Sequence, residues 1–363
     1  MVSKMNSGQR PGIRRLIFRH FRVLIAFAIM FALMGVTASL NKRFFTPAVI
    51  TSTSNQSMTL IFAGAAQTSV VITGGIDLSV GSIISMCNSL ASALFIEPAD
   101  GEPVNIANII FVVVTVLLAG AGAGLINGLI VVYGRLQPII VTLATSSIFS
   151  GIALFLRPRP GGYVPRIYGD ILTRRVGQLL PENAFGAEPM GLMAFLENVF
   201  DFIPASFIFL LLVLLVVWIP FRRSRLGLWV YAVGSNEGAA YMSGVNVNFA
   251  KVSAYVLGGL FAGIGGLFLT AQTLTGDANT GAVFTLQSIA IVVLGGTSLF
   301  GGSGGVAGTI AAAIALRFIP NILFFARVNP LQQPLWEGAV ILLAVAAGAS
   351  RIFTVRNRLD TMR

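Results

Sequence analysis

Side chains able to carry out covalent chemistry or to bind a metal ion are scarce in this sequence. His20 is the only histidine, Cys87 is the only cysteine, and the three lysines are Lys4, Lys42 and Lys251. There is no phosphate-binding loop of the form G-x-x-x-x-G-K-[ST], and no serine in a G-x-S-x-G turn has a histidine within reach. A single cysteine inside an apolar run forms no internal disulfide. The sequence therefore predicts no catalytic residue, no metal site and no cofactor, and ATP hydrolysis must reside in another polypeptide.

Charged side chains are also few within the apolar segments, which bears on coupling to an ion gradient. Only Asp77, Arg317 and Glu337 lie within or beside apolar runs. A proton or sodium relay usually places acids or bases inside the membrane. We expect Asp77 to cap a helix, Arg317 to reach the outer surface and Glu337 to begin the last apolar run. The pattern does not favour ion coupling.

Uncharged polar side chains, in contrast, recur within several apolar segments. Inside a membrane such groups need partners, either on other helices or in a wet cavity. Interhelical hydrogen bonding explains any one of them, but together they favour a pathway for a neutral, hydroxylated solute. The candidate pathway residues are Asn55, Gln56, Gln67, Asn88, Asn127 and Thr145.

Residues 221–251 form the largest expected cytoplasmic loop. Ser235 or Asn236 can cap a short helix over Glu237–Ser243, and Gly244 is expected to end it. A short capped helix outside the membrane suits docking to a soluble partner, and a surface turn set by the nearby arginines is the alternative. The candidate docking residues are Gly234, Ser235, Asn236, Glu237, Ala239, Ala240, Ser243 and Gly244.

The elements that must position these residues are membrane-spanning helices. Of the 363 residues, 55% are apolar and 10% are charged, whereas a soluble domain has about 25% charged residues. This composition excludes a soluble enzyme and a disordered chain, and it predicts a polytopic α-helical membrane protein. About ten spans are expected, over Val23–Leu40, Val49–Ile72, Leu78–Ile96, Ala107–Tyr133, Pro138–Leu156, Ile203–Pro220, Val252–Thr273, Ala282–Gly296, Gly304–Phe325 and Leu335–Ala349. Pro320 is expected to end the ninth span early.

The distribution of basic residues predicts that both termini are cytoplasmic. Bases gather in the tail 1–22, in the loop 221–251 and in the tail 351–363. The two tails flank a transmembrane domain over 23–350, and the loop interrupts it. The segment 157–202 is then a long extracytoplasmic connection. The net charge of +11 orients the spans and meets anionic lipid, so it does not indicate binding to nucleic acid.

Glycines follow two further patterns. Gly120, Gly124 and Gly128 recur every four residues, as do Gly259 and Gly263, and Gly304 and Gly308, which predicts close packing of helix backbones. The segments 71–78 and 293–299 each end an expected span with a glycine pair. Internal repeats of this kind are common in transporters.

Two motifs give the sequence a family resemblance. The run 232–246 resembles the coupling segment A-V-G-x-N-x-x-A-A-x-x-S-G-V-N of the permease subunit of ribose-type ABC sugar importers, a binding-protein-dependent inner-membrane component. That family's motif G-G-I-D-L-S-V-G-S occurs intact at Gly74–Ser82, and its members in this sequence are Gly74, Gly75, Asp77, Ser79 and Gly81. Asn127-Gly128, Leu294-Gly295-Gly296 with Gly301-Gly302, and Leu335–Val345 are also similar. The resemblance covers roughly residues 45–350.

The resemblance implies a type II ABC importer-like transmembrane domain in the bacterial inner membrane. Two permease chains, identical or paired with a sister subunit, would form the pore. Two copies of a separate ATPase would dock on residues 234–246, and an extracytoplasmic binding protein would deliver a pentose or hexose. A branched-chain amino acid or nucleoside is the alternative cargo. A secondary transporter or channel working alone is the alternative from another class, and a membrane-bound enzyme is not supported by any catalytic constellation. The sequence departs from the family in the length of 157–202 and at Glu337-Gly338, where Lys-Gly is frequent.

Overall fold

The computed structural model describes residues 13–181, 184, 191–336, 338–339 and 342 of the chain. Within these residues the fold is helical and has no β-strand. Six of the helices are long and apolar enough to cross a membrane. The all-α class expected for a multi-pass membrane protein is therefore confirmed.

In chain order, the helices are α1 (Ile13–Leu40), α2 (Pro47–Val71), α3 (Val80–Leu94), α4 (Ile106–Tyr133), α5 (Pro138–Leu156), α6 (Arg166–Thr173), α7 (Val176–Leu179), α8 (Leu192–Phe202), α9 (Ala205–Val213), the π-helical turn η1 (Leu214–Trp218), α10 (Ile219–Arg223), α11 (Arg225–Ser235), α12 (Glu237–Met242), α13 (Val247–Thr273), α14 (Val283–Leu294), α15 (Val306–Phe325) and the 3₁₀ turn η2 (Pro330–Gln332).

Most of the predicted spans coincide with helices. The first nine predicted ranges each contain helix. Most boundaries shift by a few residues, but α1 begins at Ile13, well before the predicted Val23. The third and eighth spans are short, because α3 has 15 residues and α14 has 12. The expectation that Pro320 ends a helix early is wrong, since α15 continues through it to Phe325. The tenth range, with Glu337, lies largely outside the described residues.

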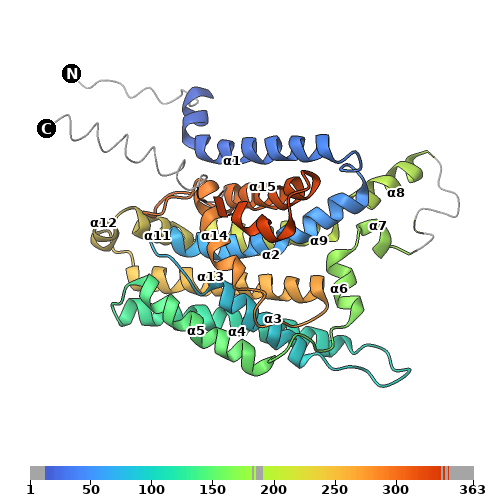
Figure 1. The fold of residues 1–363 in the computed structure, drawn as a ribbon. Helices are drawn as coiled ribbons and strands as arrows, with labels where there is room; N and C mark the ends of the chain where they lie inside the picture. The colour runs from blue at the N-terminus through green and yellow to red at the C-terminus, as the bar shows by residue number, and fades with distance from the viewer. Residues whose placement is uncertain (1–12, 182–183, 185–190, 337, 340–341, 343–363) are drawn as a thin grey trace.

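Helices α2 and α13 form the centre of the bundle and run antiparallel between its two ends (Figure 1). At one end, Asn55 of α2 donates to Thr173 O at the close of α6 over 2.7 Å, and Tyr168 of α6 donates to Leu267 O of α13 over 2.8 Å. At the other end, α13 begins beside α11 and α12. We call these the α6 end and the α12 end. The 27 residues of α13 extend about 40 Å, which exceeds the roughly 30 Å hydrocarbon core of a bilayer.

Glycines bring α4 and α13 into backbone contact, as their spacing predicts. A Cβ added to Gly120 would lie 2.6 Å from Gly259 O, and one added to Gly259 would lie 2.8 Å from Gly124 N. Only glycine permits this approach. The third glycine pair differs from the prediction, because Gly304 precedes α15 with φ +126 and only Gly308 lies in the helix. Gly308 packs against Gly295 at the close of α14.

The two glycine-paired segments have the same local structure. After α2, Gly74 has φ +83, its N–H donates to Val71 O, and Gly75 N–H donates to Val70 O. After α14, Gly296 has φ +84, its N–H donates to Val293 O, and the next N–H donates to Val292 O. Both are Schellman endings, in which the left-handed position favours glycine. The two segments therefore end their helices in the same way, and α12 also ends so at Gly244.

The sixth span is a continuous helical run with a π-helical turn inside it. Pro220 lacks an N–H to donate to the preceding turn, and η1 lies just before it. A proline and a π-bulge are common causes of a local change in helix direction.

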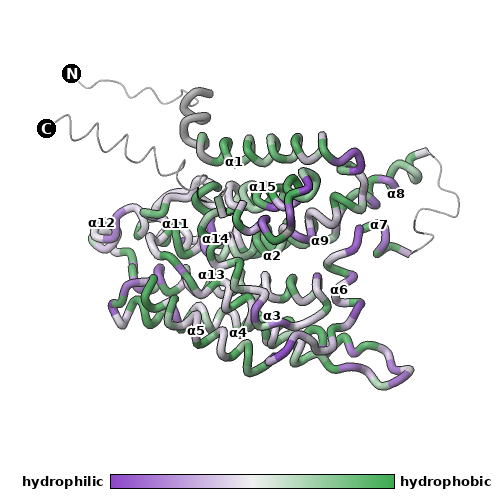
Figure 2. Tube along the Cα trace, in the orientation of Figure 1, coloured by the Kyte–Doolittle hydropathy of each residue, from purple (hydrophilic) through white to green (hydrophobic). Residues whose placement is uncertain are grey.

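The outer faces of the bundle are apolar and exposed. Leu118 of α4 is 67% exposed, Phe155 of α5 is 86% exposed and Leu212 of α9 is 58% exposed. Figure 2 shows hydrophobic colour along α1, α4 and α5, and hydrophilic colour gathered near α12 and around α6. Exposed apolar faces on neighbouring helices are suited to contact with lipid.

Candidate functional site

Helix α12 is a short, fully capped helix at the α12 end of the bundle, as the sequence predicts. Asn236 Oδ1 accepts from Ala239 N–H over 2.9 Å, and this caps the first turn. Gly244 has φ +79, and Val245 N–H donates to Ala240 O over 3.1 Å, which ends the helix. The cap falls on Asn236, and Ser235 belongs instead to the last turn of α11.

The exposed face of α12 is large and apolar. Tyr241 is 71% exposed and Met242 is 86% exposed, whereas Ala240 is buried against the protein. Tyr241 and Met242 also line a shallow cavity of about 600 Å³ with residues 244–248. An ion pair of 2.7 Å between Lys251 Nζ and Glu237 Oε2 joins the start of α12 to α13. The arrangement places exposed apolar side chains on a capped surface helix, which suits contact with another protein.

The residues just before α12 contact two other loops through backbone atoms, because the glycines there have no side chain. A Cβ on Gly234 would lie 2.6 Å from Gly302 N and closer still to Ile72 O. Gly302 N–H itself donates to Ile72 O over 2.9 Å. A Cβ atom added to Gly301 would lie 2.9 Å from Gly74 N. The ends of α2 and α11 and the loop between α14 and α15 therefore meet at one point, which we call the glycine junction (Ile72, Gly74, Gly234, Gly301 and Gly302).

Asp77 lies between α2 and α3 and does not cap a helix, so that expectation is wrong. Its Oδ1 accepts from Ser79 N–H over 2.8 Å and from Ser79 Oγ over 2.6 Å, which closes a turn before the helix begins. Helix α3 begins after Ser79, which makes no side-chain cap. Asn127 of α4 donates to Ser79 Oγ over 2.8 Å. The turn is thus fixed by a helix far away in sequence.

Four of the six predicted pathway residues are buried within the bundle. The carboxamide of Gln67, with its nitrogen toward Asp77 O, donates over 2.8 Å and accepts from Asp77 N–H over 3.2 Å. Asn127 lies beside the same turn, and its Oδ1 has no hydrogen-bond partner. Thr145 donates to Thr142 O in its own helix. Asn88 donates to Thr270 Oγ1 and Thr275 O, and it accepts from Asp277 N–H.

The remaining two, Asn55 and Gln56, line an open cavity of about 400 Å³ at the α6 end. Ligand pockets in proteins have volumes of about 300–1,000 Å³. The wall combines the start of α2 with the segment around α6 and α7, and nearly all of its side chains are polar. The lining residues are Ala48, Thr51, Ser52, Asn55, Gln56, Thr173, Arg174, Arg175, Gln178 and Gln272.

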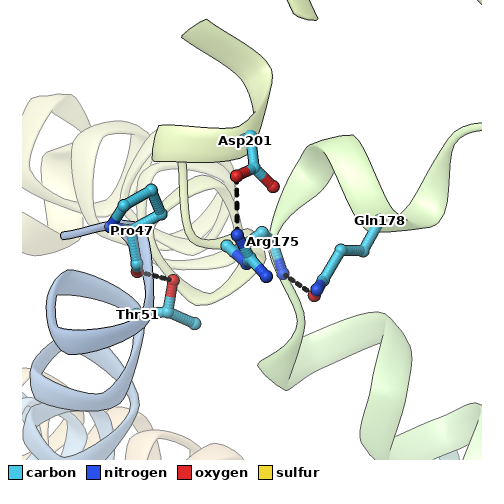
Figure 3. Close-up of polar contacts among 5 residues, drawn as sticks. All are labelled: Pro47, Thr51, Arg175, Gln178 and Asp201. Atoms are coloured by element: carbon cyan, nitrogen blue, oxygen red, sulfur yellow. Dashed lines mark hydrogen bonds and ion pairs between the residues drawn. The ribbon is translucent and has the colours of Figure 1, made fainter. Parts of the chain in front are cut away.

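Ion pairs neutralise the two arginines of this cavity. Arg175 Nη1 lies 2.6 Å from Asp201 Oδ2, and Arg174 Nη2 lies 2.8 Å from Asp170 Oδ2. Figure 3 shows Arg175 between Asp201 and Gln178. The Asn55 Oδ1 atom is buried without a hydrogen-bond partner. The cavity therefore offers amide and hydroxyl groups without a net charge, which is suited to a neutral solute.

The part of this cavity that α6 and α7 supply was not predicted from the sequence. Residues 157–202 were expected to be a long connection, yet they contain three helices and dock on the bundle. Arg157 Nε donates to Ser92 Oγ over 3.0 Å, and Gly161 pairs with Gly276. These contacts join residues far apart in sequence, and no local pattern signals them. Within the described part of the chain, no three His, Cys, Asp or Glu side chains could together hold a metal ion.

Comparison with known proteins places this arrangement in a family. Residues 49–346 match the family described as the permease component of the branched-chain amino acid transport system. The chain belongs to this permease family. No solved structure is similar enough to match.

This permease also has curated relatives that cover nearly its whole length. It is 30% identical to the ribose import permease protein of Escherichia coli strain K12 over 350 residues, 95% of this chain and 98% of the relative. It is 31% identical to the ribose import permease protein of Bacillus subtilis strain 168, over 87% of this chain and 89% of the relative. It is 29% identical to the D-allose transport system permease protein of Escherichia coli strain K12, over 95% of this chain and 96% of the relative. The expected resemblance to ribose-type ABC permeases is confirmed, and the chain is a transport subunit rather than an enzyme.

Proposed function

We propose that this permease forms the membrane pathway of an ATP-binding-cassette importer for a monosaccharide, a pentose or a hexose. The observation that carries the proposal is the end-to-end similarity to permeases named for ribose and D-allose. The geometry supports the proposal, because a neutral polar cavity and the exposed helix α12 lie at opposite ends of one helical bundle.

The α12 end faces the cytoplasm in this proposal, with about ten spans and both termini inside. Arg222, Arg223, Arg225 and Lys251 lie at the α12 end, and the cytoplasmic side of membrane proteins is enriched in such residues. The α6 end, with residues 157–202, then faces outward. Cysteines at Tyr241 and Gln178 test this orientation. A membrane-impermeant maleimide added to right-side-out vesicles should label the cysteine at position 178 and leave the cysteine at position 241 unlabelled. The reverse pattern would overturn the assignment. Cys87 is fully buried and gives little background.

At the α12 end, a separate ATPase docks on α12 and the residues around it. The proposed docking residues are Gly234, Ser235, Asn236, Glu237, Ala239, Ala240, Ser243 and Gly244, and the structure adds the exposed Tyr241 and Met242. Two permease chains and two ATPase copies make up the transporter. Movement of α12 reaches α2, α14 and α15 through the glycine junction.

At the α6 end, an extracytoplasmic binding protein delivers the sugar to the polar cavity. Asn55 and Gln56 line the entrance there. Gln67, Asn88, Asn127 and Thr145 line the deeper pathway in a second conformation, in which α2, α3, α4 and α13 have separated. The present conformation keeps these four side chains buried.

Reconstitution of the permease with its ATPase and binding protein tests the function. We expect uptake of labelled ribose or a related sugar that requires ATP and the binding protein. Uptake of leucine, a branched-chain amino acid of the kind that the family description names, or of a nucleoside in place of sugars would support the alternative cargo. Transport by the permease alone without ATP would overturn the proposal in favour of a secondary transporter or channel.

A further inference from the structure

Helix α8 has one apolar half and one polar half. At the helical period of 3.6 residues, side chains of the two kinds fall on opposite sides of the helix. The apolar half comprises Leu192, Met193, Phe195, Leu196, Val199, Phe200 and Phe202, and the polar half comprises Glu197, Asn198 and Asp201.

Asp201 on the polar half joins α8 to the protein, and much of the apolar half is exposed. Asp201 pairs with Arg175, and the Asp201 backbone lies against Gly177 of α7. Leu192 is 69% exposed and Phe195 is 63% exposed, and no residue of α8 is buried. A helix on a soluble protein usually turns such an apolar half to the core and buries it.

We propose that α8 is a membrane-boundary helix whose apolar half enters the acyl region of the outer leaflet. The argument is continuity with a lipid-facing surface. Only Ile203 and Pro204 separate α8 from α9, which begins a membrane span and exposes Phe207 and Leu211, 48% and 49% respectively. Helix α8 therefore lies where the chain enters the hydrocarbon, and Figure 1 shows it at the periphery of the bundle beyond α9.

The charges on α8 indicate that the apolar half of the helix contacts the hydrocarbon of the bilayer and not the lipid headgroups. Interfacial helices that bind anionic headgroups carry lysine and arginine on the polar face. Helix α8 carries Glu197 and Asp201 and no base. Its attachment is thus hydrophobic, and we expect it to be the same in neutral and anionic bilayers.

This attachment has a consequence for the cavity at the α6 end. Arg175 lines that cavity and is held by Asp201 of α8. A boundary helix fixed in the lipid therefore holds the α7 wall in place while α2 moves. The inference goes beyond the proposed function, because it concerns the lipid and does not depend on which solute is carried.

Spin labels on the two halves of α8 test the inference in the assembled transporter. Phe195→Cys reports on the apolar half, and Glu197→Cys is the matched control on the opposite, polar half. Both positions are exposed, and Cys87 is buried. The transporter is reconstituted in phosphatidylcholine vesicles, and collision rates are measured with oxygen, which concentrates in lipid, and with a water-soluble nickel chelate.

We expect the ratio of oxygen to nickel collisions to be severalfold higher at position 195 than at position 197. Adding anionic phosphatidylglycerol should leave that ratio unchanged. Equal nickel access at both positions would place the apolar half in water and overturn the proposal. Shielding of position 195 from both reagents would also overturn it, because a second copy of the chain or another protein would then cover α8.

Discussion

Replacing Gly234 with alanine should disconnect the proposed docking helix from the transmembrane helices. The new Cβ would lie 2.6 Å from Gly302 N and closer to Ile72 O, whereas ordinary contact begins at about 3.4 Å. The end of α11 must therefore withdraw by at least about 0.8 Å, the difference between those distances. The movement opposes the hydrogen bond of 2.9 Å between Gly302 N–H and Ile72 O.

The magnitude follows from two terms. Overpacking of a tight site costs about 1–3 kcal/mol. Weakening the hydrogen bond between Gly302 and Ile72 adds about 0.5–1.5 kcal/mol. Together they lower the stability of the contact by about 1.5–4.5 kcal/mol. A shift of that size in a two-state equilibrium is about tenfold or more. Uptake should fall by that factor even where the ATPase still binds.

Gly238→Ala is the matched control for this experiment. Gly238 lies on α12, four residues further along, and an added Cβ there meets only Asn236 Oδ1 at 3.6 Å. Alanine also favours a helix over glycine by about 1 kcal/mol. Both variants are reconstituted, and sugar uptake, substrate-stimulated ATP hydrolysis and melting temperature are measured. If the two alanines behave alike in uptake and in melting, the glycine junction does not transmit movement, and the reasoning is wrong.

Three further predictions concern the cap, the pathway and the helix packing. Asn236→Ala removes the cap of α12, costs about 1 kcal/mol, and should lower substrate-stimulated ATP hydrolysis severalfold; wild-type stimulation would contradict a docking role. Asn55→Cys should react with a polar thiol reagent in the resting transporter, whereas Asn127→Cys should react only when ATP drives the cycle. A cysteine at position 127 that never reacts would contradict the place of Asn127 in the pathway. Gly259→Ala separates α4 from α13 and should lower the melting temperature by several degrees, while Gly122→Ala, which meets no atom within 4 Å, should leave it unchanged or slightly raised.

The features that local chemistry dictates could be predicted from the sequence. Long apolar runs indicated the positions of the spans, and Asn236 with Gly244 defined α12 because caps act within one turn of the helix. The four-residue glycine spacing predicted close packing of helix backbones, and the structure shows that packing between α4 and α13.

Features set by long-range contacts could not be predicted in this way. Asp77 has the composition of a cap, but Asn127, 48 residues from Ser79, helps to fix the turn in which it lies. The α6–α8 segment is held by Arg157 on Ser92 and by Tyr168 on Leu267 O, 99 residues away. A sequence pattern contains no signal for pairs at such separations. The buried state of Gln67 likewise depends on a partner turn that no periodicity reveals.

The polar character of α2 has a consequence for how the protein is made. Helix α2 is long enough to span the bilayer, but it is not among the six helices apolar enough to do so by composition, and nearly all of Ser57–Val71 is buried. Its partners are synthesised later: Ser54 bonds to Ser206, Gly64 packs on Ile291, and Thr68 bonds to Thr309 over 3.0 Å. The insertion machinery of the cell must therefore shelter α2 until most of the chain has emerged from the ribosome. The helix at the centre of the finished bundle is thus one of the last to become stable in the membrane.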